Sequence, residues 1–520
     1  MNPIPDPALR QVAEAHASRG EWAQSLAAFQ ELLRRRPGDA DILLQLSYVS
    51  SLAGDYRQAR DFAVRAAGTA PSDPRQVLEL IARLRTFNEA PALLACLDRQ
   101  LQSARMPQAL LVGFAAQLSY LGEQSRALEL LDVARQREPD NASILLARSQ
   151  VLAYLGRLDE AEQDALACLA RSPGMWRGWP LLVGLRKQTR ELNHVAPLRR
   201  LLSQPQLPSE AIAELGFALH KSLDDLGEYD KAWSALEMAC LAKRSTLKYR
   251  TQDTVDLADA LLSYRLAPGQ APVSATQAAG PTPIFIVGMH RSGTTLLEQL
   301  LQGHSDVRGL GELYDFTCQM RQATGHHCRG VIDNEIVRLA IGVDFDAVGR
   351  GYLEGVAWRL GKEKFFIDKL PSNFLNAGFI CRALPQAKVL HMRRDPMETC
   401  FSNLRELFLD ANPYSYDQAE LGAFYRQYER VMDHWSKSFP GRILDVSYER
   451  LVEEPEQQMR AVAQFCGLPF EPGMSRLTPA AGGVSTASAV AIRQGITKQK
   501  APKWAPYASH LARLQQVLAG

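Results

Sequence analysis

Two kinds of hydrophobic pattern divide the 520 residues into two halves. Up to residue 246, apolar positions recur at the spacing of amphipathic helices. In the second half, the short apolar runs at 284–287 and 389–392 each precede a helical pattern. Such runs are typical of the buried strands of a parallel sheet. The chain is therefore predicted to hold an all-helical region and then an α/β domain with a central, largely parallel sheet.

The helical half contains a repeat of 34 residues. Its turn glycines are Gly20, Gly54, Gly122 and Gly156. In three copies a small residue, Ala59, Ala127 or Ala161, follows the glycine five residues later. In all four copies a proline follows the glycine seventeen residues later. A glycine at a helix–helix turn, a small residue where helices cross and a proline after the second helix resemble a tetratricopeptide repeat. A further copy surrounds Gly227, and residues 74–106 keep only the helical pattern.

A segment rich in Ala, Pro, Gly and Ser separates the two halves. Residues 263–282 show no amphipathic period and are predicted to be a linker. We therefore expect a repeat solenoid over 1–262 and an α/β domain over 283–520. A solenoid offers a large curved surface to an acceptor or a protein partner. The alternative is that the repeats only support the fold or form a dimer.

The strongest chemical signal follows the first apolar run. Gly288 and Gly293 bound a loop between the predicted strand and a predicted helix, as in a phosphate-binding P-loop. Thr294 replaces the Walker lysine, and no carboxylate at a strand end offers itself as a ligand for Mg²⁺. Backbone N–H groups, Arg291 and the hydroxyls of Thr294 and Thr295 still form an anion cradle. Such a cradle suits a phosphate–sulfate group without metal.

A second anion-binding pair is predicted after the second apolar run. Arg394 lies at the end of the predicted strand, and Ser402 lies eight residues further, roughly two turns into the next helix. An arginine and a serine that converge on one point would hold a second phosphate. The alternative is a helix cap at Asp395 beside a surface arginine.

Together, the stretches "VGMHRSGTTLLEQLL" and "VLHMRRDPMETCFSNL" resemble the sulfotransferase family, which uses 3′-phosphoadenosine 5′-phosphosulfate (PAPS). The resemblance covers about residues 283–505 and is greatest to the tyrosylprotein sulfotransferase-like branch. It extends through "HSDVRGLGELYDF", "DKLPSNF", "ILDVSYERLVEEP" and "STASAVAIRQGITKQKAPKW". Repeats of the kind described above also occur in bacterial members of the family.

The resemblance implies a role for each matching residue. The implied catalytic residues are Glu312, Lys369 and Arg291. The implied contacts to the sulfate end of PAPS come from Arg291, Ser292, Gly293, Thr294 and Thr295. Those to the 3′-phosphate come from Arg394 and Ser402. Further positions around the cofactor match Tyr448, Ser488 and Lys503, with Ser485 as an alternative to Ser488.

The predicted reaction is sulfuryl transfer from PAPS to a hydroxyl of an acceptor. Glu312 would accept the hydroxyl proton, while Lys369 and Arg291 offset the charge that develops during transfer. His304 is the alternative base. Protein tyrosine, a saccharide, a lipid and a small molecule remain open as acceptors. The alternative functions are a kinase-like phosphoryl transferase and a solenoid adaptor with an inactive transferase domain.

Composition and charge limit the expected binding partners and the expected cellular compartment. A net charge of +2 gives no general reason to bind nucleic acid or a membrane surface. The N-terminal segment lacks the basic and apolar regions of a signal peptide, and no apolar stretch reaches the roughly 20 residues that a membrane span needs. Eight scattered cysteines without a CxxC pair are typical of reduced thiols. We therefore expect a cytoplasmic protein with no membrane span, no bound nucleic acid and no metal.

Overall fold

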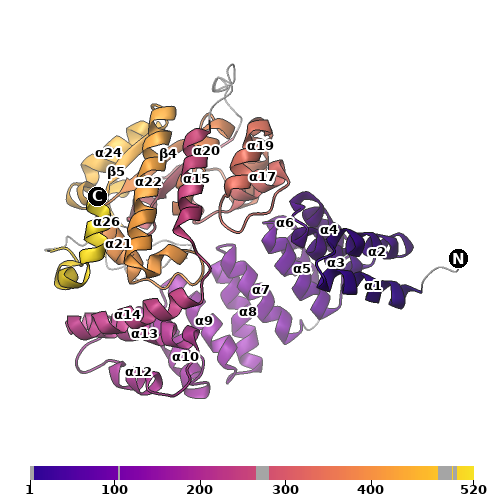
Figure 1. Cartoon of the computed structure of the whole chain (residues 1–520), viewed down its shortest axis with the longest axis horizontal. Coiled ribbons are helices and arrows are strands. Elements are labelled where there is room, and N and C mark those ends of the chain that lie inside the picture. The colour runs from indigo at the N-terminus through magenta and orange to yellow at the C-terminus, as the bar shows by residue number, and fades with distance from the viewer. Residues whose placement is uncertain (1–4, 103–105, 265–279, 478–494, 496–500) are drawn as a thin grey trace. The chain divides into compact units, whose positions relative to one another are not determined.

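The computed structural model describes residues 5–102, 106–264, 280–477, 495 and 501–520 (Figure 1). These residues form two compact units, and each unit draws on both halves of the sequence. One unit comprises Met1–Ala134 and Tyr314–Arg359, and the other comprises Arg135–Leu313 and Leu360–Gly520. The predicted fold class is confirmed, because the elements described before residue 264 are all helices and a parallel sheet follows.

The repeat region is a series of helix–turn–helix units. Their helices are α1 (Asp6–Ser18), α2 (Trp22–Arg35), α3 (Ala40–Leu52), α4 (Tyr56–Gly68), α5 (Pro74–Thr86), α6 (Ala90–Leu101), α7 (Gln108–Tyr120), α8 (Gln124–Arg137), α9 (Ala142–Leu155) and α10 (Leu158–Arg171). The turn residues Gly54 and Gly156 have φ angles of 85° and 81°, a region that favours glycine. Ala59, Ala127 and Ala161 are fully buried where paired helices cross. The structure therefore confirms the predicted repeat geometry.

The repeat copy that lacks a turn glycine has an asparagine at that position. Asn88 stands 34 residues after Gly54 and 34 before Gly122, between α5 and α6. Its φ angle is 58°. Asparagine adopts the left-handed conformation more readily than most residues other than glycine. The 34-residue period therefore continues without a break from Gly20 to Gly156, which the glycine pattern alone did not reveal.

In the first unit, the repeats hold a segment from the second half of the sequence. Its helices are α17 (Asp315–Thr324), α18 (Asn334–Leu339), η1 (Ala340–Gly342), α19 (Phe345–Val356) and η2 (Ala357–Arg359). At the start of α4, the N–H of Tyr56 donates to the Gly325 carbonyl at 2.9 Å, and Arg57 Nε donates to the Gln322 carbonyl at 2.7 Å. The buried Tyr56 ring also packs against His327. This segment is thus fixed by contacts with a repeat helix.

The second unit is built on a five-stranded parallel sheet in the order β2-β3-β1-β4-β5. The strands are β1 (Thr282–Gly288), β2 (Val307–Gly309), β3 (Phe365–Asp368), β4 (Lys388–Arg393) and β5 (Ile443–Ser447). Ile284 of β1 pairs with Ile367 of β3, and Ile286 pairs with Leu390 of β4. Because the strands are parallel, the loops that follow β1, β3 and β4 meet at one edge of the sheet.

Helices cover both faces of this sheet. On one face, α16 (Thr294–Leu301), α23 (Tyr448–Glu453) and α24 (Pro455–Cys466) share an apolar core with the strands. On the other, α22 (Gln418–Ser438) reaches β4 through a hydrogen bond of 2.5 Å between the Tyr428 hydroxyl and His391 Nε2. Figure 1 shows α15, α20 and α22 side by side over β4. Further elements are α20 (Ala377–Ala383), α21 (Pro396–Leu404), α26 (Ala512–Ala519), η3 (Pro371–Phe374), η4 (Pro413–Tyr416), η5 (Pro472–Ser475) and η6 (Ala505–His510).

The second unit also contains the last helices of the repeat region, and the final three of these pack on the α/β core. These last helices are α11 (Gly178–Leu185), α12 (Val195–Leu202), α13 (Ser209–Asp225), α14 (Tyr229–Ser245) and α15 (Thr251–Ser263). Arg405 donates to Asp224 of α13 at 2.6 Å, and Arg244 of α14 makes a bidentate pair with Glu420 at 2.7 and 2.8 Å. Residues 265–279 of the predicted linker lie outside the described residues. The boundaries at 262 and 283 therefore stay predictions.

This packing predicts that a fragment of residues 275–520 will not fold stably by itself. Its loss of α13–α15 would expose buried aromatic side chains such as Tyr416, which packs edge-on against Phe217 at 6.0 Å. Full burial of one large apolar side chain contributes about 1.5–3 kcal/mol, so exposing several would remove much of a typical net stability of about 5–15 kcal/mol. Circular dichroism melting and gel filtration of the fragment and the full chain would test this. A monomeric fragment with a cooperative transition near that of the full chain would contradict it.

No helix among the described residues is both long enough and apolar enough to cross a bilayer.

Candidate anion-binding and transfer site

The loop after β1 has the backbone geometry of an anion cradle. Gly293 caps α16 with a φ angle of 107°, and a Cβ at this position would collide with the ring of Tyr448. Thr294 and Thr295 open the helix and are buried. Ser292 is 1% exposed, and its hydroxyl has no hydrogen-bond partner among the described residues. An anion held by the helix N-terminus would satisfy this hydroxyl, so these residues fit such a ligand.

Arg394 lies beside this loop, at the end of β4. Its guanidinium donates to the Arg291 carbonyl at 3.3 Å, contacts Glu398 at 2.5 Å and lies 4.4 Å from the centre of the Tyr448 ring. The other oxygen of Glu398 accepts the backbone N–H of Lys503 at 2.6 Å. The structure thus brings together Arg394, Tyr448 and Lys503, which were predicted from separate stretches. Glu398, which connects them, was not predicted.

Arg291 connects the two predicted halves of the nucleotide site. Its backbone has a φ angle of 64°, and its Nε donates to the Ser402 hydroxyl at 3.3 Å. Its guanidinium also lies 3.5 Å from Glu406. The arginine predicted for the sulfate end therefore contacts the serine predicted for the 3′-phosphate. Both side chains can reach a single bound nucleotide from this arrangement.

The electrostatics of this cluster favour an anion. Loss of water around its ammonium group, and then the positive charges of Arg405, Arg394 and Arg291, lower the pKa of Lys503. Glu398 opposes this shift only in part. A bound phosphate or sulfate would offset the mutual repulsion of these cations.

A second cluster joins the loops after β2 and β3. Lys369 directly follows β3 and is fully buried. Its Nζ lies 2.6 Å from Glu312 Oε1 and 4.0 Å from Glu298 Oε2. Glu298 also accepts the backbone N–H of Gly311 at 3.2 Å, which positions the loop that carries Glu312. The Glu312 side chain is 36% exposed, so solvent or an acceptor can reach it.

The charges in this second cluster are interdependent. Burial alone would lower the pKa of Lys369, but the nearby Glu312 and Glu298 carboxylates outweigh burial and raise it. Burial raises the pKa of Glu298, and the positive charge of Lys369 opposes that rise. Lys369 is therefore held as a buried cation by the two carboxylates.

A repeat helix borders the predicted base within the second unit. Burial, and then the negative charge of Glu312, raise the pKa of Tyr154 in α9. His304, the alternative base, is buried and lies 3.5 Å from Glu471. The Glu312 carboxylate is thus near enough to Tyr154 of a repeat helix for its charge to act on that side chain.

Besides Glu398, three residues of this site were not predicted from the sequence. Glu298 is the only charged side chain within the apolar helix pattern of α16, and that contrast was an available signal. His290 lies in the anion loop, and burial lowers its pKa to about 4, which leaves it neutral at pH 7. Asp368 corrects the expectation that no carboxylate ends a strand, because it is the last, buried residue of β3 beside β1. β3 has only four residues, too few for a visible pattern.

Ser488 and its alternative Ser485 lie outside the described residues, and their roles stay predictions. Among the residues that the structure describes, no group of three or more His, Cys, Asp or Glu side chains is placed to hold a metal ion.

Comparison with known proteins agrees with this geometry. Residues 283–472 match the sulfotransferase family. An uncharacterized protein of Aquifex aeolicus is 27% identical over 96% of this chain and 68% of its own length. Protein-tyrosine sulfotransferase 2 of Gallus gallus is 28% identical over 36% of this chain and 51% of its own length. The sulfotransferase domain of the Synechococcus PCC 7002 olefin synthase is 21% identical, with a TM-score of 0.31, over 47% of this chain and 96% of that domain.

Proposed function

We propose that this protein transfers a sulfuryl group from PAPS to a hydroxyl of an acceptor, without metal. One observation supports this most strongly. A phosphate-binding loop without a Walker lysine lies beside Arg394, Ser402 and Lys503, at the edge of the sheet where the Glu312–Lys369 pair also lies. The match of residues 283–472 to the sulfotransferase family supports the same reaction class.

The nucleotide would be held by groups that need no divalent cation. The N-terminus of α16, with Ser292, Thr294 and Thr295, would bind the 5′ phosphate–sulfate group. Arg394 and Ser402 would bind the 3′-phosphate, because a guanidinium and a hydroxyl are good partners for phosphate oxygens. Arg291, which contacts Ser402, would bind between these two groups.

The transfer step would use the buried cation and the exposed carboxylate of the second cluster. Glu312 would take up the acceptor proton as the hydroxyl oxygen attacks sulfur. Lys369 and Arg291 would stabilise the charge on the transferred group and on the leaving phosphate. Bound PAPS supplies the sulfuryl group, and in-line transfer depends mainly on positioning and charge stabilisation.

Protein tyrosine is the acceptor that we propose first. Support comes from relatives named protein-tyrosine sulfotransferases and from repeat helix α9, which borders Glu312. Repeat arrays commonly bind polypeptides on an extended surface. In this view the repeats have two roles, because they brace the α/β core and offer a surface to the acceptor.

The choice of nucleotide tests this proposal. We expect the protein to bind 3′-phosphoadenosine 5′-phosphate in EDTA and to bind ATP much more weakly, since the loop lacks the lysine that a triphosphate needs. Isothermal titration calorimetry with each nucleotide, with and without Mg²⁺, would measure this. Tight Mg²⁺–ATP binding without binding of the bisphosphate would favour the kinase-like alternative. No binding of either nucleotide would favour the adaptor alternative.

The 3′-phosphate contact gives a separate prediction. Arg394→Ala should weaken PAPS binding about 10- to 150-fold, because a hydrogen bond to a charged group contributes about 1.5–3 kcal/mol. It should barely affect the analogue that lacks the 3′-phosphate. Arg393→Ala is a matched control, because Arg393 is the exposed neighbour and pairs with Asp445 at 3.2 Å. Equal losses for both nucleotides would mean that Arg394 only holds the fold.

A further inference from the structure

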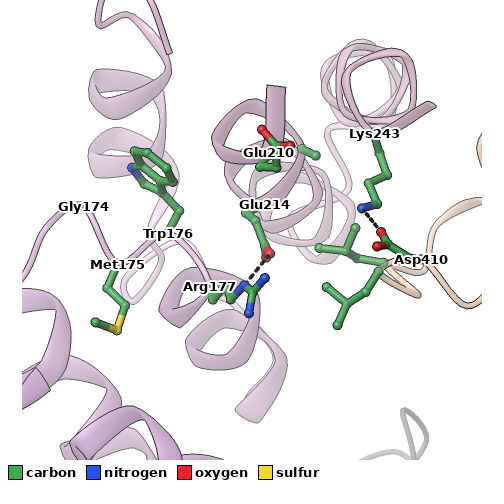
Figure 2. A pocket seen from close by; sticks show the side chains of 11 residues that line it. Gly174, Met175, Trp176, Arg177, Glu210, Glu214, Lys243 and Asp410 are labelled. Atoms are coloured by element: carbon green, nitrogen blue, oxygen red, sulfur yellow. Dashed lines mark hydrogen bonds and ion pairs between the residues drawn. The ribbon is translucent and has the colours of Figure 1, made fainter. Parts of the chain in front are cut away.

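A separate cavity of about 420 Å³ lies in the second unit (Figure 2). It is bounded by α13, α14, the segment before α11 and the loop after α21. Its apolar lining includes Met175, Trp176, Ala213, Leu407 and Leu409. Its volume falls within the range of pockets that bind small ligands, about 300–1,000 Å³.

The cavity contains a buried carboxylate whose negative charge is offset only weakly by neighbouring groups. Glu214 is 9% exposed, and no hydrogen bond to its carboxylate occurs within the described part of the chain. Its ion-pair partner is Arg177 at 3.7 Å, whose side chain is 75% exposed (Figure 2). An ion pair of this kind contributes little, whereas a buried charge without hydrogen bonds is costly. Burial accordingly raises the pKa of Glu214, and Arg177 and Lys243 oppose the rise.

The buried cation of the cavity, Lys243, already has a close partner. Lys243 lies 2.7 Å from Asp410 on the opposite wall, as Figure 2 shows. Glu210 adds a further carboxylate to the lining. With three carboxylates against two cations, the cavity complements a cationic group on an apolar stem. Lysine and arginine side chains have this form.

One wall of the cavity continues directly into the transfer site. Leu407 lines the cavity, and the preceding residue, Glu406, lies 3.5 Å from Arg291. Consecutive Cα atoms are about 3.8 Å apart. The cavity wall and the side chain that contacts Arg291 therefore belong to consecutive residues of one loop.

We infer that the cavity binds a lysine or arginine side chain of the acceptor polypeptide, with Glu214 as the partner of the cationic group. The apolar stem would lie against Trp176 and Leu409. The inference rests on the proposed function in one respect only, since it takes the bound polypeptide to be the acceptor. Binding itself requires no nucleotide and no turnover.

Calorimetry on the full chain without nucleotide would test the site. The probes are acetyl-Leu-Arg-Leu-amide, the same peptide with neutral citrulline in place of arginine, and n-pentylguanidinium. We expect the arginine peptide to bind about 10- to 150-fold more tightly than the citrulline peptide, as one charge-assisted contact predicts. Glu214→Gln should abolish that preference. Glu237→Gln, an equal change of net charge at an exposed position of α14, should leave it intact.

A second variant keeps the inference testable if Glu214→Gln unfolds. Arg177→Ala removes the exposed competitor for Glu214 and should tighten binding of the arginine peptide; unchanged or weaker binding would count against the site. Equal affinities for the arginine and citrulline peptides would overturn the inference. If n-pentylguanidinium binds as tightly as the peptide, the ligand is a small amine or guanidine and not a polypeptide. Failure of the proposed function would be detected separately, because the protein would then not bind 3′-phosphoadenosine 5′-phosphate.

Discussion

Glu312→Gln should lower the kcat of sulfuryl transfer by about 10²–10⁴, the usual contribution of a general base. The carboxylate is 36% exposed and lies 2.6 Å from the buried ammonium of Lys369, so it is both reachable and held in place. Glutamine keeps the shape of the side chain but cannot take up the acceptor proton. Affinity for 3′-phosphoadenosine 5′-phosphate should barely change, because the hydrogen bond that Glu312 accepts comes from Lys369.

Steady-state kinetics and calorimetry on the same preparation would separate these effects. Glu456→Gln is a suitable control, because Glu456 is an exposed carboxylate that pairs with Arg460 at 2.7 Å on the surface of α24. Full activity of Glu312→Gln would place the base elsewhere, and His304→Gln would then be assayed next. A parallel loss of nucleotide affinity would indicate a structural role for Glu312.

Lys369→Met should reduce both activity and stability. Loss of one group that stabilises transition-state charge typically lowers kcat by about 10²–10³. The same change leaves Glu298, 4% exposed, without its cation. Removing one partner of a buried ion pair destabilises a protein by about 3–5 kcal/mol. Urea unfolding at pH 7 would measure this second effect independently of turnover.

The stability of Lys369→Met should also depend on pH in a defined direction. Glu298 already has a raised pKa, and Lys369 opposes that rise, so removing Lys369 raises it further. A carboxyl whose pKa is higher in the folded than in the unfolded state binds protons preferentially when folded. Its destabilising effect is therefore absent below the ordinary carboxyl pKa, near 4.5, and grows as pH rises through the raised value.

Melting temperatures at pH 5 and pH 8 would test this sign. Lys369→Met should lose more stability than the wild type between pH 5 and pH 8. The double variant Glu298→Gln/Lys369→Met should lose that extra pH dependence, because the buried carboxyl is gone. If the double variant behaves like Lys369→Met, Glu298 is not the group that Lys369 compensates.

Much of the local structure followed from the sequence alone. The turn at Gly54 and the helix crossing at Ala59 depend on residues within a few positions of each other, and both were confirmed. The strands at 284–287 and 389–392 were visible as apolar runs, because buried parallel strands need little else. The turn at Asn88 was missed because asparagine adopts a positive φ less often than glycine, so it gives a weaker signal.

The arrangement of the site was settled only by tertiary structure. Glu398 accepts a hydrogen bond from the backbone N–H of Lys503, 105 residues further along the chain. Lys369 donates a hydrogen bond to Glu312, which lies 57 residues earlier in the sequence. No local spacing encodes such contacts, because they depend on which strands pair and on how each loop leaves the sheet.

The sequence by itself determined the repeat period, the strand–loop–helix motif and the residue types of an anion site. Each of these depends on backbone propensity or side-chain periodicity within about one repeat. Only the tertiary structure decided that α13 and α14 pack on the α/β core and that residues 314–359 belong to the unit of the first repeats. The physical reason is that burial of apolar surface is non-directional, so the faces that meet depend on the path of the whole chain.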